Sequence, residues 1–404
     1  VVCSSDLYHF FSPLLATNQA WAAFGWQTFS DAAPELGSAL AAADACAPLS
    51  KQHPLWVPCL PDWLRKNEFR EFIKKLGRDQ AIIAFPAGTA SVKEQETACQ
   101  QLRQEGIHVA LEITDSSVLK ALTVTSFDHL AFDAEHARNG VPLLDLINAN
   151  QYGYKLTATG VHTHELFDWA VAKRFSLLSS EFVATIDARA PVDADTTRLK
   201  LLKLLSLVVQ DADTREIEEI FRQEPKLSYN LLRLVNSVAV GPKTPITGFN
   251  QAITVLGRRQ LQRWLQLLIY ANQFGQAGQP NPLMQLAASR GRQMELLSKD
   301  LPPIPDIQDT GDAAFMTGIF SLLDTLLRLP MAEILAALPL DPTIGAALAD
   351  RNGQLGQMLA AVVYASEGKH KEAAEALTAL GVSPEKHLDA QVGAYIWASR
   401  IALE

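Results

Sequence analysis

The chain has 404 residues, of which 48% are hydrophobic and 20% are charged, and its formal net charge is −9. This composition predicts a globular protein with room for about two or three hydrophobic cores, and it excludes a mainly disordered chain. Basic and acidic side chains number 15 and 21 up to Ala190 and 20 and 23 after it, so neither half has the bulk charge of a nucleic-acid-binding protein.

The cysteines and the N-terminal stretch bear on the cellular compartment. Cys3, Cys46, Cys59 and Cys99 are far apart and form no C-x-x-C pair, which favours reduced thiols over a zinc ribbon or a disulfide framework. The N-terminal stretch lacks a basic region leading into an apolar core, and no segment has the uncharged apolar length of a membrane-spanning helix. We therefore expect a cytoplasmic protein that does not insert into a membrane.

Short apolar strands alternate with helical segments in the first half of the chain. Strands are predicted at 81–85, 108–113, 129–133, 154–160 and 175–178. Because parallel strands need a crossover connection, this alternation predicts a parallel sheet, in a β/α barrel or an open α/β fold. Functional groups of such folds lie where the strands end, and the residues at those places are Phe85, Glu112, Asp133, Thr159 and His162.

One stretch of the first half resembles a known family. The sequence KLTATGVHTHELFDWAVAKRFSLLSSEF, residues 155–182, keeps Ala158, Val161, Thr163 and Phe175 in step with the seventh and eighth strands of EAL domains. EAL domains are barrel phosphodiesterases that hydrolyse cyclic di-GMP. The resemblance implies an EAL-type, TIM-like β/α barrel over residues 1–190.

The same resemblance assigns the metal-binding positions of the family to residues of this chain. EAL enzymes bind two divalent metal ions through carboxylates and an asparagine, with a lysine near the attacking water. These positions fall at Gln27, near Pro58, at or beside Phe85, and at Glu112, Ile113, Ala131, Thr159, His162 and Ser179. Only Glu112 among them is acidic, so two divalent cations would lack charge compensation. The resemblance therefore predicts a degenerate EAL domain without catalytic residues, phosphodiesterase activity or a cofactor.

Four residues near three neighbouring strand ends leave an alternative open. Glu112, Asp133, His162 and His164 could form a re-purposed metal site, because His-x-His on an extended segment puts both imidazoles on one face. In the other interpretation Glu112 caps the following loop, Asp133 is a solvated strand end, and both histidines are exposed loop residues.

The second half is predicted to be all helical. The run ATIDARAPVDADTT, residues 184–197, has few large apolar residues and predicts a boundary between a domain at 1–190 and a second domain at 191–404. Helices are expected from 198, from 214 and from 227, and then around 245–270, 284–299, 313–328, 331–337, 343–349, 354–367, 369–380 and 384–403.

The strongest resemblance in the chain is that of EIFRQEPKLSYNLLRLVNSVAVGPKTPITGFNQAITVLGRRQLQRWLQLL to HDOD domains. The matching residues are Pro225, Leu231, Leu232, Arg233, Asn236, Ser237, Ile246, Ala252, Ile253, Leu256 and Gly257. HDOD domains resemble the HD metal-dependent phosphohydrolases but lack their His-Asp dyad. Here Ser321 and Leu322 stand in the place of the dyad, and neither can hold a metal ion. The resemblance implies a helical HDOD domain without hydrolase activity, in which Gly257 forms the turn between two packed helices.

Three arginines, Arg258, Arg259 and Arg263, follow that turn. A helix that reads DNA needs a wider basic surround for phosphates, which the acidic net charge does not supply. We therefore interpret these arginines as a candidate surface for a protein partner.

Taken together, the two halves resemble the tandem EAL–HDOD signalling proteins of bacteria. This resemblance predicts a non-catalytic signal-transduction scaffold in a cyclic di-GMP network, which binds protein partners and no nucleic acid. Two alternatives remain open: a receptor that binds cyclic di-GMP without hydrolysing it, and a metal-dependent hydrolase that uses Glu112, Asp133, His162 and His164. A homodimer through the barrel is also left open.

Overall fold

The computed structural model describes residues 7–29, 36–86, 92–121, 127–189, 195–210, 212–223, 229, 231–232, 235–236, 246, 248–271 and 280–401. The chain folds into two compact units. The barrel unit comprises Val1–Thr185, Ala365–Lys371 and Ser383–Val392, and the helical unit comprises Ile186–Tyr364, Glu372–Val382 and Gly393–Glu404. Two C-terminal segments therefore belong to the barrel unit. The predicted domains, 1–190 and 191–404, place both segments in the second domain instead.

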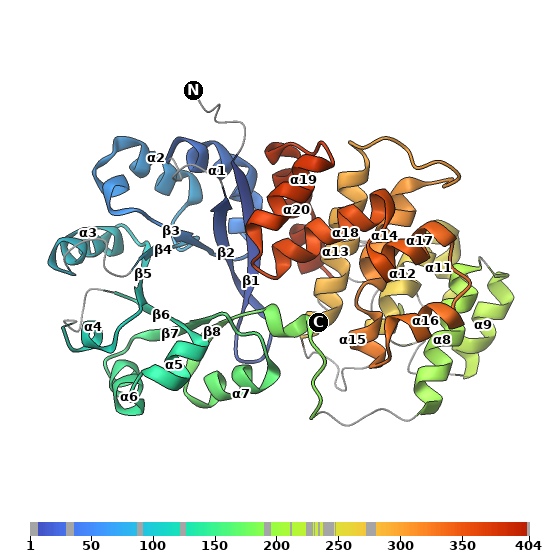
Figure 1. Ribbon diagram of the computed structural model, residues 1–404, viewed down its shortest axis with the longest axis horizontal. Coiled ribbons are helices and arrows are strands. Elements are labelled where there is room, and N and C mark those ends of the chain that lie inside the picture. The colour runs from blue at the N-terminus through green and yellow to red at the C-terminus, as the bar shows by residue number, and fades with distance from the viewer. Residues whose placement is uncertain are drawn as a thin grey trace. The chain divides into compact units, whose positions relative to one another are not determined.

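The barrel unit contains a closed barrel of eight strands in sequence order (Figure 1). The strands are β1 (Tyr8–Leu15), β2 (Trp21–Phe29), β3 (Leu55–Pro58), β4 (Ala81–Phe85), β5 (His108–Ile113), β6 (His129–Asp133), β7 (Lys155–Thr159) and β8 (Phe175–Ser179). From β2 to β8 each strand is parallel to the next, whereas β1 is antiparallel to both β2 and β8. The predicted fold class, a TIM-like β/α barrel followed by an all-helical region, is confirmed.

The strand pattern predicts neither β3 nor the hairpin of β1 and β2. Both strands of the hairpin are buried on both faces over much of their length. Alternation of apolar and polar residues needs one solvated face, so strands buried on both sides lack the period of two. A tight turn joins them, closed by a hydrogen bond from the Ala16 amide to the Ala20 carbonyl.

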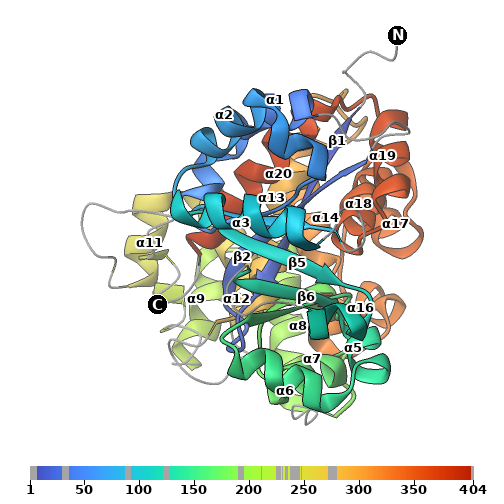
Figure 2. The same ribbon diagram turned by 90° about the vertical axis from the view of Figure 1, so that its left-hand side faces the viewer.

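Helices connect the parallel strands. They are α1 (Leu36–Ser50), η2 (Pro61–Arg65), α2 (Asn67–Leu76), α3 (Val92–Gln104), α4 (Ser116–Ala121), α5 (Ala134–Gly140), α6 (Leu143–Gln151), α7 (His164–Ala172) and η3 (Glu181–Ala184). In α2, apolar side chains recur at helical spacing and are buried at Phe69, Phe72, Ile73 and Leu76, which explains why this segment forms an amphipathic helix. Figure 2 shows α3 lying beside β5.

The barrel interior is filled by apolar side chains, alanines together with larger residues. One buried cluster draws members from seven of the eight strands: Leu14, Ala23, Trp56, Ile82, Ala84, Ala110, Ala131 and Leu177. Thr157 of β7 pairs in register with Ala131 and is fully buried. These residues identify the inner face of each strand, because side chains of a strand alternate between its two faces.

Where the structure describes it, the helical unit is built from helices alone. They are α8 (Asp195–Val209), α9 (Thr214–Gln223), α11 (Phe249–Leu256), α12 (Arg258–Ala271), α13 (Pro282–Ser298), α14 (Thr310–Phe320), α15 (Leu323–Leu327), α16 (Met331–Ala337), α17 (Pro342–Asp350), α18 (Gly353–Ser366) and α19 (His370–Ala379). The last helix, α20 (Pro384–Ser399), has residues in both units. The helix predicted at 313–328 is interrupted at Ser321 and Leu322, so it forms α14 and α15 rather than one helix.

Residues of the HDOD-like pattern have local structural roles. Gly257 separates α11 from α12 with φ +75°, which confirms the predicted glycine turn. The Asn236 side chain donates to the carbonyl oxygens of Leu232 and Ile246, both at 2.7 Å, and its Oδ1 accepts from the Ile246 amide at 2.7 Å. This amide therefore fixes the distance between two chain positions ten residues apart. Pro225, Arg233, Ser237 and the side chain of Ile253 lie outside the described residues.

Two further expectations concern cysteines and membranes. Cys46, Cys59 and Cys99 are buried thiols outside any disulfide, and Cys3 lies outside the described residues. Over the described part of the chain, no helix combines the length and apolar character needed to cross a bilayer.

Candidate functional site

The carboxyl ends of the parallel strands form one rim of the barrel, and several predicted site residues lie on its inner face. Glu112 is two residues beyond Ala110 on β5, and Asp133 is two residues beyond Ala131 on β6. The same alternation from the buried cluster brings Gln27, Pro58, Thr159 and Ser179 to the inner face at the ends of their strands. The topology thus gathers these positions at one rim, as the strand pattern predicts.

Two of the predicted positions face away from that rim. Phe85 is completely buried and alternates with Ala84, which belongs to the interior cluster. Ile113 is 2% exposed and alternates with Glu112. Their side chains pack on the outer side of the strands and are not part of the rim surface. Ala131 lies inside the barrel as part of the apolar cluster.

Glu112 is the carboxyl group on the inner face of β5. Its side chain is partly buried, and burial raises the pKa of Glu112 above its usual value. Desolvation favours the neutral form of a carboxyl group unless an opposite charge compensates it. Burial is the sole cause of this shift. The carboxyl group is therefore held in surroundings that do not stabilise its anion.

Asp133 has a structural role at the end of β6. It is the N-cap of α5, and its Oδ1 accepts from the His136 amide at 2.8 Å. Its Oδ2 lies near Gly160, since a Cβ added to that glycine would be 2.8 Å from the carboxylate oxygen and 3.6 Å from Nε2 of His162. Asp133 and His162 are thus neighbours across the rim, and both are exposed.

His164 does not join these two residues. It begins α7, its Nε2 lies 3.1 Å from the Thr185 carbonyl oxygen, and its ring packs edge-on against Phe182 at 5.0 Å. Within the described ranges, no group of three or more His, Cys, Asp or Glu side chains is arranged to hold a metal ion. The predicted set of four therefore reduces to one close pair, Asp133 and His162.

The remaining rim hydroxyls bond to the backbone. Ser179 is 5% exposed and its Oγ accepts from the Val161 amide at 3.0 Å, while Thr159 donates to the Phe132 carbonyl oxygen at 3.2 Å. Pro58 lines a small, largely apolar hollow of about 70 Å³ with Trp26 and Trp63. These groups offer no anionic oxygen to a divalent cation.

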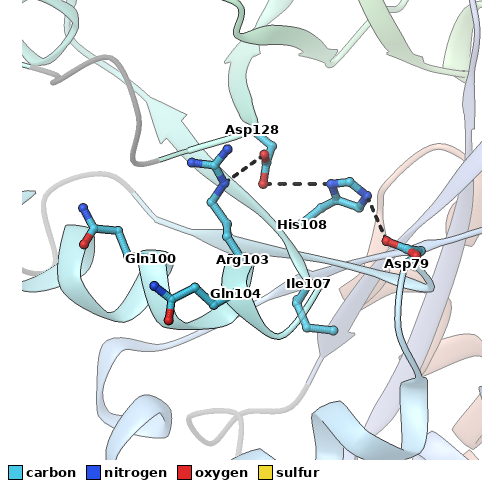
Figure 3. A pocket seen from close by; sticks show the side chains of 8 residues that line it. Asp79, Gln100, Arg103, Gln104, Ile107, His108 and Asp128 are labelled. Carbon is cyan, nitrogen blue, oxygen red and sulfur yellow. Dashed lines mark ion pairs between the residues drawn. The ribbon is translucent and has the colours of Figure 1, made fainter.

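A larger hollow, of about 510 Å³, lies at the amino ends of the strands, opposite the predicted rim (Figure 3). Arg103 of α3 pairs with Asp128 at 3.0 Å. His108 lies between two carboxylates, 3.7 Å from Asp79 and 3.9 Å from Asp128. Sequence reasoning misses this place because it considers only the carboxyl ends of the strands. In the sequence, this site is indicated only by the polar and charged residues between Arg103 at the end of α3 and His108 at the start of β5.

In the helical unit, the place assigned to the lost dyad is buried. Ser321 is 7% and Leu322 is 2% exposed. Ser321 donates to the Gly318 carbonyl oxygen at 2.7 Å and accepts from Nη1 of Arg290 at 3.3 Å. Arg290 is itself 4% exposed. A guanidinium group therefore occupies the surroundings in which a metal-binding dyad would need anionic and imidazole ligands.

The arginines proposed as a partner surface make ion pairs inside the helical unit. Arg263 is partly buried, contacts Glu295 at 2.9 Å and also pairs with Asp312, and it lies 4.9 Å from the centre of the Phe315 ring. Arg259, which is more exposed, pairs with Asp309 and Asp312. The side chain of Arg258 lies outside the described part. These pairs give Arg263 a role in holding α12 against α13 and α14.

Comparisons with known proteins assign part of the chain to a domain family. Residues 196–332 match the HDOD domain. Over 307 residues the chain is 24% identical to the cyclic di-GMP phosphodiesterase CdgJ of Vibrio cholerae serotype O1, a match that covers 74% of this chain and 69% of CdgJ.

Two further similarities cover about half of the chain or less. The chain is 28% identical over 211 residues to the uncharacterized protein YuxH of Bacillus subtilis, and the match covers 51% of this chain and 50% of YuxH. Among solved structures, the EAL domain of Mycobacterium smegmatis DcpA is similar at 17% identity and a TM-score of 0.36, over 43% of this chain and 90% of that one. The HDOD match lies over the segment in which the sequence pattern resembles HDOD domains.

Proposed function

We propose that this chain is a non-catalytic regulatory protein of a cyclic di-GMP signalling network and acts by binding other proteins. The HDOD match and the similarity to a protein named as a cyclic di-GMP phosphodiesterase support the signalling context. The chemistry of the barrel rim supports the absence of catalysis, and it is the observation on which the proposal rests.

The donor set at the rim does not fit a pair of divalent metal ions. Gln27, Pro58, Thr159 and Ser179 are neutral. Of the two carboxylates, Asp133 caps α5, and Glu112 has a raised pKa because of burial. Two magnesium or manganese ions need several hard anionic oxygens arranged around them. We therefore infer that the barrel does not hydrolyse a phosphodiester through two metal ions.

The helical unit supports the same conclusion independently. Ser321 and Leu322 are buried, and neither side chain is a strong metal ligand. Arg290 adds a positive charge beside Ser321. A cation and a metal ion would compete for the same anionic surroundings. We infer that this unit also works by contact rather than by hydrolysis.

The exposed face of α6 supports an interaction role for the barrel unit. The α6 face, which we define as Leu143, Leu144, Ile147 and Tyr152, consists of large apolar side chains that are 43–65% exposed. Exposed apolar clusters of this kind are typical of protein contacts. Because the four side chains carry no charge, two copies of the face can meet without electrostatic repulsion. We propose that it forms a homodimer contact.

The proposal is tested by titrating the full chain with cyclic di-GMP in a calorimeter, with Mg²⁺ and with Mn²⁺, alongside an assay for the linear product. We expect no product with either metal. Binding without product would instead make the protein a cyclic di-GMP receptor. Product formation would contradict the proposal and favour the metal-dependent hydrolase.

A matched variant shows whether any turnover belongs to this site. If product is formed, Glu112→Gln removes the carboxylate on the inner face of β5 and should abolish it, whereas Glu105→Gln alters an exposed carboxylate before β5 and should not. Equal activity of the wild type and Glu112→Gln would assign the product to a contaminating enzyme.

A further inference from the structure

β1 lacks a strand along part of one edge. It pairs with β2 from Tyr8 to Leu15, but with β8 only at Leu14 and Leu15. A hairpin joins β1 to β2, so no crossover helix lies between them. Among the described strands, none pairs with the β8-side edge of β1 from Tyr8 to Pro13. An uncovered edge of this kind exposes backbone groups and favours pairing with other chains.

The C-terminal strap, which we define as residues 365–371 and 383–392, covers this edge. The Phe11 amide donates to Oε1 of Gln391 at 3.0 Å, and Nε2 of Gln391 donates to the Phe11 carbonyl oxygen at 3.5 Å. Gln391 is 2% exposed. One side-chain amide thus supplies the donor and the acceptor that a neighbouring strand would provide.

Two histidines of the strap enclose Phe10 of β1. The Phe10 ring stacks on His370, with ring centres 4.9 Å apart, and lies 5.0 Å from the ring of His387. Tyr8 meets His387 edge-on at 5.9 Å. His387 is 1% exposed, so an imidazole is completely enclosed where the strap contacts β1.

Burial holds two imidazoles of this region in their neutral form, His387 at the contact and His9 on the opposite face of β1. It lowers the pKa of His387 to about 3, and it lowers the pKa of His9 on β1 to about 4. His9 accepts a hydrogen bond from Nε1 of Trp26 at 3.1 Å, which requires an unprotonated Nδ1. The two ring nitrogens of His387 are buried without a well-aligned hydrogen bond, although the backbone of His9 lies close enough to oppose the pKa shift in part.

The described groups around the two imidazoles would not stabilise the positive charge that protonation brings. His387 and His9 disfavour each other's charge. His370 lies across Phe10, and Tyr8 is neutral near pH 7. On the same helix as His387, Asp389 interacts with Cys46 of α1 and is exposed. No carboxylate therefore contributes to the electrostatics of either imidazole among the groups described.

We propose that the C-terminal strap is an acid-sensitive cover of β1, released when His387 takes up a proton. Release exposes Tyr8, Phe10 and the backbone edge at Phe11. It also alters the barrel rim, because Phe10 is the register partner of Gln27 in the β1–β2 ladder. Acidification would thereby make a strand edge and an aromatic surface available for pairing, independently of the proposed signalling function.

The size of the effect follows from linkage. A released imidazole has a pKa of about 6.5. Each histidine that gains a proton on release shifts the equilibrium by about tenfold per pH unit below that value, until its buried pKa is reached. Protonation of His387 on release predicts that the released fraction rises roughly eightfold from pH 6 to pH 5.

The test is hydrogen exchange by mass spectrometry on the full chain, from pH 7 to pH 5, with intrinsic rates corrected for pH. In the wild type, peptides covering 8–13 and 384–392 should open together, and below pH 6 the logarithm of their opening constant should rise by about one for each unit of acidification. His387→Leu should reduce this slope to about zero, whereas His9→Gln, at a ring that faces Trp26 on the other side of β1, should leave it near one.

Three comparisons make the result decisive. Gln391→Ala should raise opening at every pH without changing the slope, because it removes hydrogen bonds and no titrating group. His108→Gln, a half-exposed histidine at the amino end of β5, should leave slope and opening unchanged. A peptide covering 81–85 should stay protected. A pH-independent opening constant, or equal loss of protection in 81–85, would overturn the proposal.

Discussion

At the scale of single residues, the chain buries ionisable side chains whose charged form lowers the stability of the folded protein. Glu112 is such a group, because its pKa is raised by burial and by no neighbouring charge. The folded protein therefore binds this proton more tightly than the unfolded chain does. Its contribution to stability is present at low pH and is lost as the pH rises through the raised pKa.

Replacing the Glu112 carboxyl group by an amide should remove the decrease in folding stability that its ionisation causes. We expect Glu112→Gln to increase the melting temperature relative to the wild type, by a difference that is near zero at pH 4 and grows toward pH 8. Thermal unfolding followed by circular dichroism across this range measures it. Glu105→Gln, at an exposed position, should show no such trend. A constant difference at all pH values would mean that burial of the charge is not the cause.

At the scale of elements, a close contact between α13 and α14 in the helical unit depends on two glycines. A Cβ added to Gly318 of α14 would lie 2.6 Å from Cα of Gly291 on α13, and one added to Gly291 would lie 2.9 Å from the Phe315 carbonyl oxygen. Both distances are shorter than van der Waals contact and involve backbone, which a rotamer change cannot move. The two helices can approach this closely only because neither residue has a side chain.

A methyl group at this crossing should force the helices apart. We expect Gly318→Ala to lower the free energy of unfolding by about 1–3 kcal/mol, the usual cost of overpacking. Gly345→Ala is the matched control, since that glycine lies in α17 with nothing within 4 Å of an added Cβ. The control should be neutral or more stable by up to about 1 kcal/mol. Urea unfolding compares the two, and equal midpoints would show that the crossing tolerates a methyl group.

At the scale of the whole molecule, the α6 face determines the expected association state. Burying these apolar side chains against a second copy would remove them from water, which favours association. We expect the wild-type chain to be a dimer by light scattering coupled to size exclusion, and Leu144→Asp to shift it toward monomer at micromolar concentration. The reason is that a buried carboxylate without a partner is strongly unfavourable.

The control for this prediction uses another exposed apolar residue. Val255 of α11 is 50% exposed, and Val255→Asp should leave the dimer intact. Equal effects of the two substitutions, or a wild type that is monomeric at every concentration, would contradict a homodimer through α6.

Much of the architecture is legible in the sequence because it is encoded locally. Strand and helix alternation from residue 81 predicts β4 to β8, and each predicted strand lies within a residue or two of the observed one. Gly257 is recognisable as a turn because few residues other than glycine adopt its positive φ without strain. The rim residues are also predictable, since parallel strands end at one rim whatever their side chains are.

Orientation at the rim is less predictable. The sequence predicts Phe85, Ile113 and Glu112 equally as rim residues. Whether each side chain points into the barrel or away from it depends on which face of its strand forms the barrel interior. The spacing groups His164 with His162, yet α7 begins at His164 and turns its ring toward Thr185. A two-residue spacing places side chains on one face only while the backbone remains extended.

By itself, the sequence determined that this protein is a β/α barrel followed by helices, that it carries an HDOD pattern and that its rim is poor in anionic side chains. The tertiary structure alone decided that a hairpin closes the barrel and that the C-terminal strap belongs to it. The bond between Phe11 and Gln391 joins residues 380 positions apart. Such a contact leaves no periodic signal in either segment, because it joins the backbone of one residue to the side chain of another far along the chain.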